Sequence, residues 1–512
     1  MLLMENSSWA LLALLHLAAL AFLTKIVFRR QPKRNLPPGP RPWPVIGNLN
    51  LVGSVPHRSL HFLSQKYGDI MQLKFGKFPV VVASSPEMAK QFLRVHDTVF
   101  ASRPALAAGK YTSFNYSNMT WAPYGPFWRQ ARKIYLSEVF SAKKLESLEH
   151  IRIEERRNFL ARLYSLSGKP VVLREHLSRY TLSSISRMVL SSKCFSESED
   201  DKSVVKLDEL QEMLDEWFLL NGVFNIGDWV PWLSFLDLQG YVKRMKALHK
   251  KLDKFLSHVI NDHQTRRETE KDFVRGDVVD ALLPMAEDPN LEVKLTRDRF
   301  KGLIQGLLSG GTDSAATTIE WAIHELMQNP HVIKKGKEEL DRVIGRNRWV
   351  EEKDFPNLPY IDAIIMESMR LHPLSTILAP HYAMQDCKVA GYDISKGTTI
   401  LINTWSIGRD PNSWDAPNQF LPERFVGKEI DLTGSNFALL PFGSGRRRCP
   451  GYNLGLKIVR TILANLLHGF NLKLIDGMKP KDICMEELYG LTVHPKKPLA
   501  IIMEPMLPKN FY

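Results

Sequence analysis

The most constraining feature of the chain is a ten-residue loop near its C-terminus, Phe442-Gly443-Ser444-Gly445-Arg446-Arg447-Arg448-Cys449-Pro450-Gly451. A single cysteine lies inside this glycine-rich, arginine-loaded loop, and a helix-forming stretch follows from Leu454. Gly443 and Gly445 permit backbone angles and close approaches that a β-carbon forbids. Backbone N–H groups then turn inward toward a buried anion. The pattern predicts a loop wrapped around the sulfur of Cys449, with the positive end of the next helix aimed at it.

Each residue type in the loop has a role if Cys449 is the axial thiolate ligand of a haem iron. Donors directed at the sulfur tune such a ligand, as outer groups do at metal sites in general. Arg447 supplies the charge that a haem propionate needs as a partner. The alternative is a basic loop with a buried structural cysteine. A nuclear-localisation signal is disfavoured, because the run of three arginines is short and Cys-Pro-Gly follows it.

The spacing of Phe442, Gly445, Arg447, Cys449 and Gly451 resembles the haem loop of the cytochrome P-450 family. The members of this family are haem-thiolate monooxygenases. The resemblance implies a mostly α fold with a small β-sheet portion and haem b as cofactor. The resemblance extends over almost the whole chain. The sequences of the proline-rich segment and of Phe224–Trp229 are most similar to those of microsomal members from plants.

A long helical pattern runs from about Thr296 to Gln328, with Gly310 and Gly311 in its middle. Two adjacent glycines inside a helix cost stability, about 1 kcal/mol each relative to alanine. Either the gap makes room for dioxygen beside the iron, with Asp313 and Ser314 delivering protons, or it marks a close helix–helix crossing. The segment resembles the family's oxygen-binding motif, with Ser314 in place of the usual threonine.

Further positions match the family one by one. Trp128 and Arg132 lie one helical turn apart and resemble its propionate-binding Trp-x-x-x-Arg pair, and His381 stands where an arginine is frequent. With Arg447 and Cys449 they form the expected cofactor set, in which Cys449 is the metal ligand. The resemblance also implies a structural triad that locks the core beneath the haem: Glu367, Arg370 and Arg424.

The N-terminal region divides into two segments before the catalytic domain. Residues 1–28 are expected to form a transmembrane helix, because Trp9 to Phe28 are nearly all apolar and about 20 residues cross a bilayer. Residues 29–56 form a basic, proline-rich hinge, and 57–512 the catalytic domain. The basic flank places that domain in the cytosol by the positive-inside rule, which predicts single-pass anchoring in the endoplasmic reticulum. A cleaved signal peptide is the alternative.

Two β-hairpins are expected within the catalytic domain. The first joins Asp69–Phe75 to Phe78–Ala83 through Gly76-Lys77. The second joins Lys388–Ile394 to Thr398–Asn403 through Ser395-Lys396-Gly397. Most of the remaining chain has a helical period.

Composition bears on location and partners. The 512 residues carry a net charge of +13 and only four cysteines, which fits a reducing, cytosol-facing location. Basic residues around the cysteine loop suit docking of an acidic flavoprotein reductase, although they also suit a merely solvated face. These residues are Arg129, Lys133, Arg446 and Arg448. No nucleic-acid-binding motif is found in the sequence, and membrane lipid is the other expected partner.

These features predict a monooxygenase that takes electrons from NADPH through a reductase and oxidises a hydrophobic small molecule, a terpenoid or a phenolic of plant specialised metabolism. A haem-thiolate enzyme of carbon–carbon cleavage, dehydration or rearrangement, acting for example on a terpene alcohol, is the alternative. A membrane haem protein without catalysis is a further one. No motif specifies the substrate. The segments expected to contact it are Ala101–Tyr124, Phe218–Val223, Gly306–Ser314, Leu374–Leu378 and Gly490–Thr492.

Overall fold

The structure is a computed structural model that describes residues 18, 34–191, 206–269, 276–428 and 430–512. The predicted transmembrane segment lies outside the described residues, apart from residue 18. Among the helices of the described ranges, none combines the length and the apolar composition that crossing a membrane requires. Of the predicted hinge, residues 34–56 are described. They pack on the first sheet, where Gln72 N–H donates to the Pro38 carbonyl over 2.8 Å.

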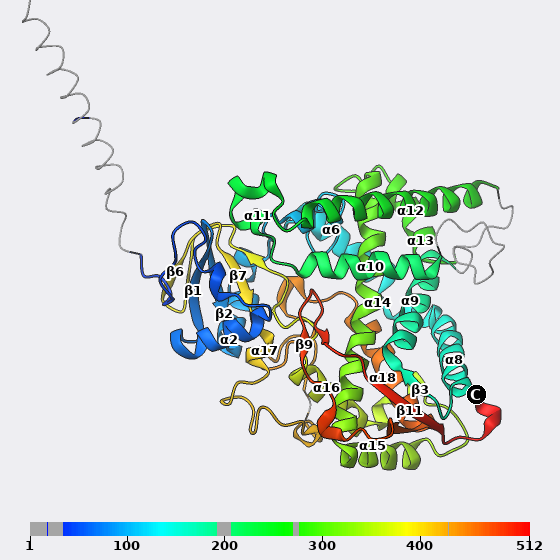
Figure 1. Cartoon of the computed structure of the whole chain (residues 1–512). Helices are drawn as coiled ribbons and strands as arrows, with labels where there is room; N and C mark the ends of the chain where they lie inside the picture. Colours follow the sequence, from blue (N-terminus) through cyan, green and yellow to red (C-terminus); the bar gives the residue numbers. More distant parts are fainter. Residues whose placement is uncertain (1–17, 19–33, 192–205, 270–275, 429) are drawn as a thin grey trace, which may run out of the picture.

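Helices make up most of the described chain, as the sequence predicts (Figure 1). The α-helices are α2 (Pro56–Tyr67), α3 (Pro86–Lys90), α4 (Asp97–Phe100), α5 (Ala107–Thr112), α6 (Pro126–Ile134), α7 (Ala142–Ser147), α8 (Glu149–Ser165), α9 (Leu173–Leu190), α10 (Leu207–Gly222), α11 (Ile226–Trp229), α12 (Tyr241–Thr269), α13 (Val278–Glu287), α14 (Arg297–Gln328), α15 (Pro330–Val343), α16 (Pro359–Leu371), α17 (Thr404–Ile407) and α18 (Tyr452–Gly469). Short 3₁₀ and π turns connect them: η1 (Leu49–Leu51), η2 (Gln91–Val95), η3 (Tyr135–Val139), η5 (Pro231–Leu236), η6 (Glu352–Asn357), η7 (Pro422–Arg424), η8 (Gly445–Arg447), η9 (Pro480–Asp482) and η10 (Lys509–Phe511).

The strands form small sheets, and the largest lies beside the helical body, at the left of Figure 1. Its order is β1-β2-β7-β4, in which only the β2–β7 pair is parallel. The others have the orders β3-β11-β8, β10-β9 and β5-β6. The strands are β1 (Ile70–Phe75), β2 (Phe78–Ala83), β3 (Pro170–Val172), β4 (His381–Tyr382), β5 (Cys387–Val389), β6 (Tyr392–Ile394), β7 (Thr399–Ile402), β8 (Phe470–Leu474), β9 (Glu487–Leu488), β10 (His494–Pro495) and β11 (Ala500–Pro505).

Of the two predicted hairpins, the first is confirmed and the second is wrong. The strands β1 and β2 pair antiparallel around Gly76-Lys77. In the second region the reversal occurs earlier, at Ala390-Gly391, where φ is 47° and 85°, so that β5 pairs with β6. Two successive positive φ angles define the tight turn that matches strand twist. The segment expected to close the hairpin becomes β7 and joins β2 instead.

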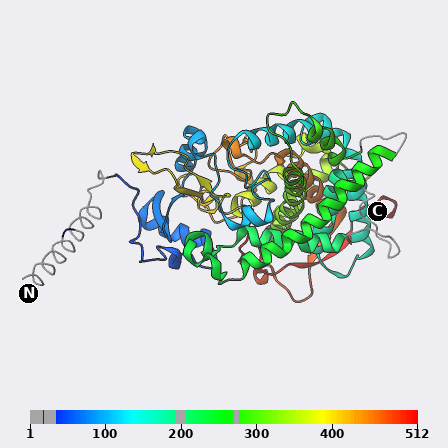
Figure 2. The ribbon, with the colours of Figure 1, turned by 90° about the horizontal axis from the view of Figure 1, so that it is seen from above.

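The predicted long helix is confirmed as α14, which runs through the middle of the helical body (Figures 1 and 2). The hydroxyl of Thr296 caps its first turn by accepting from Arg299 N–H. Because α14 is surrounded by other elements, most of its side chains are buried on every face. Because such a helix is buried on all sides, it has no amphipathic stripe, and its sequence is recognised as helical by its length and its end signals.

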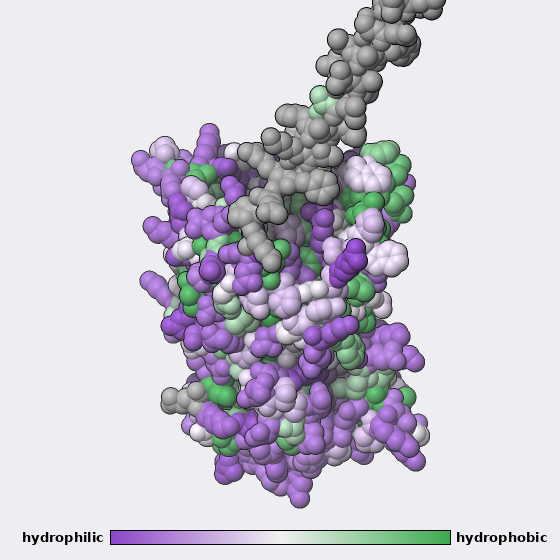
Figure 3. Space-filling view, turned by 90° about the vertical axis from the view of Figure 1, so that its left-hand side faces the viewer, coloured by the Kyte–Doolittle hydropathy of each residue, from purple (hydrophilic) through white to green (hydrophobic). Residues whose placement is uncertain are grey.

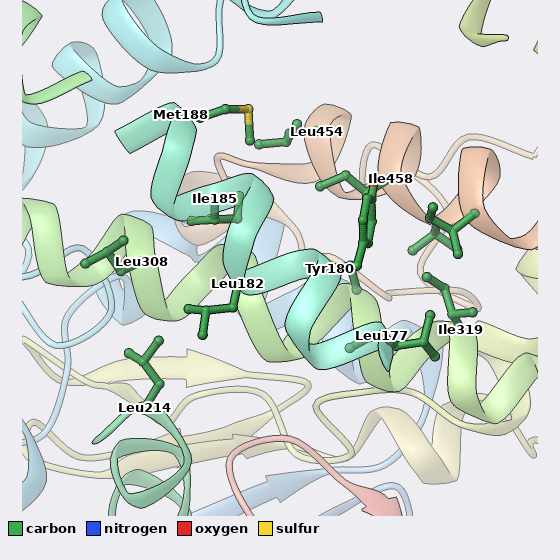
Figure 4. Close-up of a cluster of buried hydrophobic side chains, with 14 of the residues drawn as sticks. Leu177, Tyr180, Leu182, Ile185, Met188, Leu214, Leu308, Ile319, Leu454 and Ile458 are labelled. Atoms are coloured by element: carbon green, nitrogen blue, oxygen red, sulfur yellow. The ribbon is translucent and has the colours of Figure 1, made fainter. Parts of the chain in front are cut away.

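The packing of α9 shows how the core is assembled around α14. Figure 4 shows apolar side chains of α9 pointing between α14, α10 and α18. Leu177 and Ile185 of α9 belong to the same buried cluster as Leu308 of α14 and Ile458 of α18. Full burial of such a side chain contributes about 1.5–3 kcal/mol. The two helices that carry Asp313 and the residues after Cys449 are thus fixed against one common neighbour.

Candidate functional site

A cavity of about 350 Å³ lies between α14 and the cysteine loop, and residues from both line it. Cys449 is on one wall, and Gly310, Gly311 and Ser314 of α14 are on another. Segments far apart in sequence therefore meet around one space, as the motifs predict. Trp128, Arg132, His381 and Arg447 also line this cavity.

The cysteine loop takes the backbone conformation that its glycines permit. Gly443 and Gly445 have φ of 66° and 64°. A β-carbon on Gly445 would lie 2.1 Å from the Leu93 carbonyl oxygen, which no side chain tolerates. The loop is closed by Cys449 N–H, which donates to the Phe442 carbonyl over 2.9 Å. The helix α18 begins at Tyr452, just beyond the cysteine.

Two opposing effects act on the pKa of the Cys449 thiol. Burial raises the pKa of the Cys449 thiol, while a hydrogen bond from the Gly451 backbone and the charges of Arg132 and Arg448 lower it. Burial prevails in the protein alone. A bound cation such as iron deprotonates a coordinating thiol outright. The surroundings therefore suit a thiolate that is formed by coordination.

Three guanidinium groups converge on the same cavity from different elements: Arg103, Arg132 and Arg447. They are held by backbone carbonyls, since Arg447 donates to Ala101 and Ala122, each over 2.6 Å. Among the described residues no carboxylate forms an ion pair with any of the three. Burial, together with Arg103 and Arg132, lowers the pKa of Arg447 to about 8. A cluster of half-buried cations without ion-pair partners in the described chain fits an anionic ligand, and the two propionates of haem match it.

Arg103 is not among the cofactor-binding residues that the sequence predicts. Its half-buried guanidinium donates to the carbonyls of Thr120, Ala379 and Pro380. Burial lowers its pKa to about 9. No motif spacing marks this arginine in the sequence, where Pro104 follows it. Only the fold brings it next to Arg447.

Trp128 and His381 line the cavity as predicted, but their N–H groups already form hydrogen bonds with backbone carbonyls. The Trp128 indole N–H donates to the Met119 carbonyl over 3.3 Å. The His381 Nδ1 lies 2.9 Å from the Phe100 carbonyl, so Nδ1 carries the proton. Burial and the charge of Arg103 hold the pKa of His381 well below its usual range. The neutral ring offers a propionate no second donor, so the arginines carry the anion-binding character of the site.

The two glycines of α14 have different surroundings. A β-carbon on Gly310 would meet nothing within 4 Å, whereas one on Gly311 would lie 2.4 Å from Cδ1 of Ile185 in α9. The structure thus shows open space at one glycine and a close helix crossing at the other. Gly310 leaves open space in the cavity, and Gly311 permits the close crossing of α14 and α9. Ser314 also lines the cavity, and its hydroxyl donates to the Gly310 carbonyl over 2.9 Å.

Asp313 lies on the other side of α14 from this space. Its carboxylate forms an ion pair with Arg174 of α9 and accepts from the Thr492 hydroxyl over 2.6 Å. His494 lies 3.3 Å away. Burial raises the pKa of Asp313, but the charges of Arg174 and His494 outweigh it and hold the pKa below its usual range. The structure therefore places Ser314 in the cavity wall and Asp313 in a second, polar cavity behind it.

The predicted triad is brought together in the core. Both Glu367 and Arg370 are buried, and two bonds of 2.7 Å join them. Arg424 Nε donates to the same carboxylate over 3.0 Å. Arg370 also donates to the carbonyls of Gly408 and Pro417, so it ties α16 to the segment that precedes the cysteine loop.

The expected substrate segments divide between the two cavities. Residues of Ala101–Tyr124, Gly306–Ser314 and Leu374–Leu378 line the main cavity. Residues of Phe218–Val223 and Gly490–Thr492 line the polar cavity behind α14 instead.

Comparison with known proteins agrees with this geometry. The family model described as cytochrome P450 matches residues 37–502. The chain belongs to the cytochrome P450 family. A P450 of this kind holds haem and receives its electrons from a reductase, and the relatives support monooxygenase activity.

Two plant relatives and one solved P450 illustrate the likeness. The chain is 45% identical to the trimethyltridecatetraene synthase of Zea mays over 93% of this chain and 90% of that protein. It is 41% identical to the flavonoid 3'-monooxygenase of Arabidopsis thaliana over 97% of each. A zebra fish cytochrome P450 structure with progesterone has a TM-score of 0.74 at 26% identity, covering 88% of this chain and 99% of that one.

Proposed function

We propose that this P450 takes electrons from NADPH through a flavoprotein reductase and oxidises an acyclic terpenoid alcohol, breaking a carbon–carbon bond and releasing a hydrocarbon. The observation that carries the proposal is the wall of the main cavity contributed by α14 and the segment after α16. Its members are aliphatic, small or hydroxylated: Leu307, Gly310, Ser314, Thr318, Leu374, Ser375 and Leu378.

The hydroxyl groups of this wall can accept a hydrogen bond from a ligand, because their own protons are already donated to the backbone. Ser314, Thr318 and Ser375 donate to the backbone carbonyls of Gly310, Ser314 and Ile377 respectively. Each hydroxyl oxygen keeps a free lone pair. Such a wall fits a long apolar molecule with one hydroxyl donor. A polyphenol would bury several polar groups there with few partners, which is costly.

The name of the maize relative gives the reaction type. It denotes a branched hydrocarbon, so an oxygen-activating enzyme that forms it releases the oxygen in other products. The balance for an alcohol is one dioxygen, two electrons and two protons on one side, and one hydrocarbon, one carbonyl fragment and two waters on the other. The carbon that bears the hydroxyl becomes the carbonyl, and the bond beside it breaks.

Haem, when bound at Cys449, supplies the activation of dioxygen. We assign the remaining work to side chains of the chain. The three arginines would hold the haem propionates, and Gly310 keeps the cavity open on the α14 side. Ser314 holds a hydroxyl in the cavity wall for proton transfer. Asp313 fixes this turn of α14 through Arg174 and connects it to the polar cavity, from which protons enter.

We place the reductase on the exposed basic face beside the cysteine loop. Arg129, Lys133 and Arg446 are exposed there. Glu292 pairs with Arg129 at 3.4 Å, and Asp97 with Arg446 at 3.3 Å. Basic character remains in Lys133 and Arg448. An acidic partner gains in association rate from such a face.

We place the membrane at the exposed apolar side chains of η5 and of the N-terminal part of the described chain. Trp232 and Phe235 of η5 are 64% and 80% exposed, and Trp43 is 64% exposed. Figure 3 shows the end of the molecule near the largest sheet, where apolar side chains gather at one corner of a mostly hydrophilic face. Large exposed apolar side chains mark sites of membrane or partner contact. This supports the predicted location at the endoplasmic reticulum membrane, with the catalytic domain in the cytosol.

The test uses the full chain in membranes with a reductase and NADPH, and three substrates. An acyclic sesquiterpenoid tertiary alcohol, the matching hydrocarbon without its hydroxyl, and a flavonoid without a 3'-hydroxyl are supplied separately. We expect a shortened hydrocarbon and a carbonyl fragment from the alcohol alone.

The second candidate is hydroxylation of a phenolic, which the 41% identity to the Arabidopsis flavonoid 3'-monooxygenase favours. Conversion of the flavonoid with the alcohol left intact would establish that candidate and exclude the first. Oxygenation of the alcohol without loss of carbon would leave a hydroxylase of terpenoids.

A further inference from the structure

A compact group of potential metal ligands lies away from the main cavity, where α12 ends and α13 begins. Within the ranges that the structure describes, His263, Asp277 and Asp280 are the residues whose ligand atoms gather closely enough for one ion, all within 4.8 Å of one another. Their exposed fractions are 0%, 1% and 2%. A buried imidazole beside two buried carboxylates needs a compensating positive charge.

The imidazole is oriented as a ligand would be. His263 Nδ1 lies 2.7 Å from the Val259 carbonyl one turn earlier in α12, so this nitrogen carries the proton. Nε2 then points at Asp277, with 3.0 Å between Nε2 and Oδ2. Metal-binding histidines commonly donate their other N–H to a backbone carbonyl, which fixes the ring and the tautomer.

The carboxylates are held by the backbone and still have capacity left. Asp277 caps α13, because its Oδ1 accepts from Asp280 N–H over 2.9 Å. Gly276 N–H donates to Asp280 Oδ2 over 3.0 Å. Asp280 Oδ1 is buried and has no hydrogen-bond partner. A buried carboxylate oxygen without a partner is costly, and it points to a missing cation.

We propose that His263, Asp277 and Asp280 bind one divalent cation of the zinc class, with a water as the fourth ligand. An imidazole nitrogen with two carboxylate oxygens is a donor set that zinc accepts in tetrahedral geometry. Calcium and magnesium require six or more ligands, mostly oxygen atoms, and the three side chains supply too few oxygen ligands. The proposal is independent of the substrate and of the haem.

The site has a structural consequence for the main cavity. Val278 directly follows Asp277 and lines that cavity, and α13 shares the buried cluster with α9 through Val279 and Leu282. A cation that joins the end of α12 to the start of α13 therefore fixes the first turn of α13 against the cavity wall. We assign it a stabilising role, not a catalytic one.

The experiment titrates the purified full chain, without an affinity tag and after chelator dialysis, with zinc chloride alone. Calorimetry and thermal unfolding are the readouts. We expect one tight equivalent and a rise of a few degrees in the unfolding midpoint, since a ligand that binds only the folded state raises it. Asp280→Asn and His263→Gln each weaken zinc binding at least about tenfold.

Two matched substitutions on the same helix, His258→Gln and Asp262→Asn, serve as controls and leave zinc binding unchanged. If Asp280→Asn does not fold, the dialysed and reloaded wild type decides, because the midpoint must fall on dialysis and recover with zinc. Absence of a stoichiometric equivalent in the wild type overturns the proposal. Equal zinc binding in the wild type and the Asp280→Asn variant does so as well.

Discussion

At the scale of single residues, Cys449 combines a buried sulfur with two nearby arginine charges and a backbone donor. We expect Cys449→Ser to lose the red-displaced absorption of the reduced, carbon monoxide-treated protein, because a hydroxyl is a poor axial ligand. Changes around metal ligands alone cost about 10–100-fold in affinity or activity, so loss of the ligand should exceed this. The measurement is the difference spectrum together with product formation. Cys484→Ser is the control, and a normal spectrum in Cys449→Ser would refute the ligand assignment.

Ser314 is a hydroxyl-bearing residue of α14 in the cavity wall, and Ser314→Ala removes that oxygen with little change of volume. We expect the variant to release several times more hydrogen peroxide per NADPH consumed, since positioned proton donors contribute about 10²–10⁴-fold in favourable cases. Ser314→Thr retains the hydroxyl and should keep peroxide release near that of the wild type. Equal coupling in the alanine variant would show that protons reach the site by another route.

At the scale of elements, the glycine pair of α14 gives a matched comparison. Gly311→Ala places a β-carbon against Ile185 of α9, and overpacking of this kind costs about 1–3 kcal/mol. Gly310→Ala meets open space and gains helix propensity, about 1 kcal/mol. We expect the unfolding midpoint to fall for Gly311→Ala and to stay or rise for Gly310→Ala. The reverse order would contradict the assignment of the two glycines.

The triad links α16 to the segment before the cysteine loop through a carboxylate that is entirely buried. Glu367→Gln leaves Arg370 buried with a neutral partner, and breaking a buried pair costs about 3–5 kcal/mol. We expect a lower urea midpoint and faster loss of haem. Glu423→Gln is the matched control, because its ion pair with Lys335 is largely exposed and pairs of that kind contribute about 0–1 kcal/mol. Similar losses in both variants would remove the special role of Glu367.

The same elements show what the sequence predicts and what it does not. The helix α14 follows from the length of its helical pattern, which is a local signal. The second hairpin is wrong because Ala390, an ordinary residue, adopts the positive φ that the turn requires. Local composition pointed to Ser395-Lys396-Gly397 instead, and tertiary pairing of β7 with β2 decided the outcome.

The candidate site also has parts that the sequence predicts and parts that it does not. The glycine spacing and the single cysteine predict the loop around Cys449, because the backbone there depends on its own residues. Arg103 is invisible in the sequence, since its role comes from burial beside Arg447. The position of Asp313 also depends on tertiary structure. Adjacent residues of a helix point about 100° apart, so Asp313 and Ser314 face different cavities.

At the scale of the whole molecule, the chain has a basic face beside the cysteine loop and an apolar corner at η5. In the function proposed above, the reductase and the membrane would contact these two different surfaces. The apolar corner is the part of this arrangement that a direct measurement can test.

The last prediction concerns that corner, in a chain that begins at residue 29 and thus lacks the predicted transmembrane segment. The double variant Trp232→Ser, Phe235→Ser removes two highly exposed side chains. Burying each in a bilayer is worth about 1.5–3 kcal/mol, and 1.4 kcal/mol is tenfold in affinity. We expect sedimentation with phospholipid vesicles to weaken at least about tenfold. Phe62→Ser changes an apolar side chain that is 72% exposed on α2, outside the η5 corner, and should leave vesicle binding intact. Equal losses in the two variants would mean that general hydrophobicity, rather than this corner, holds the chain to the lipid.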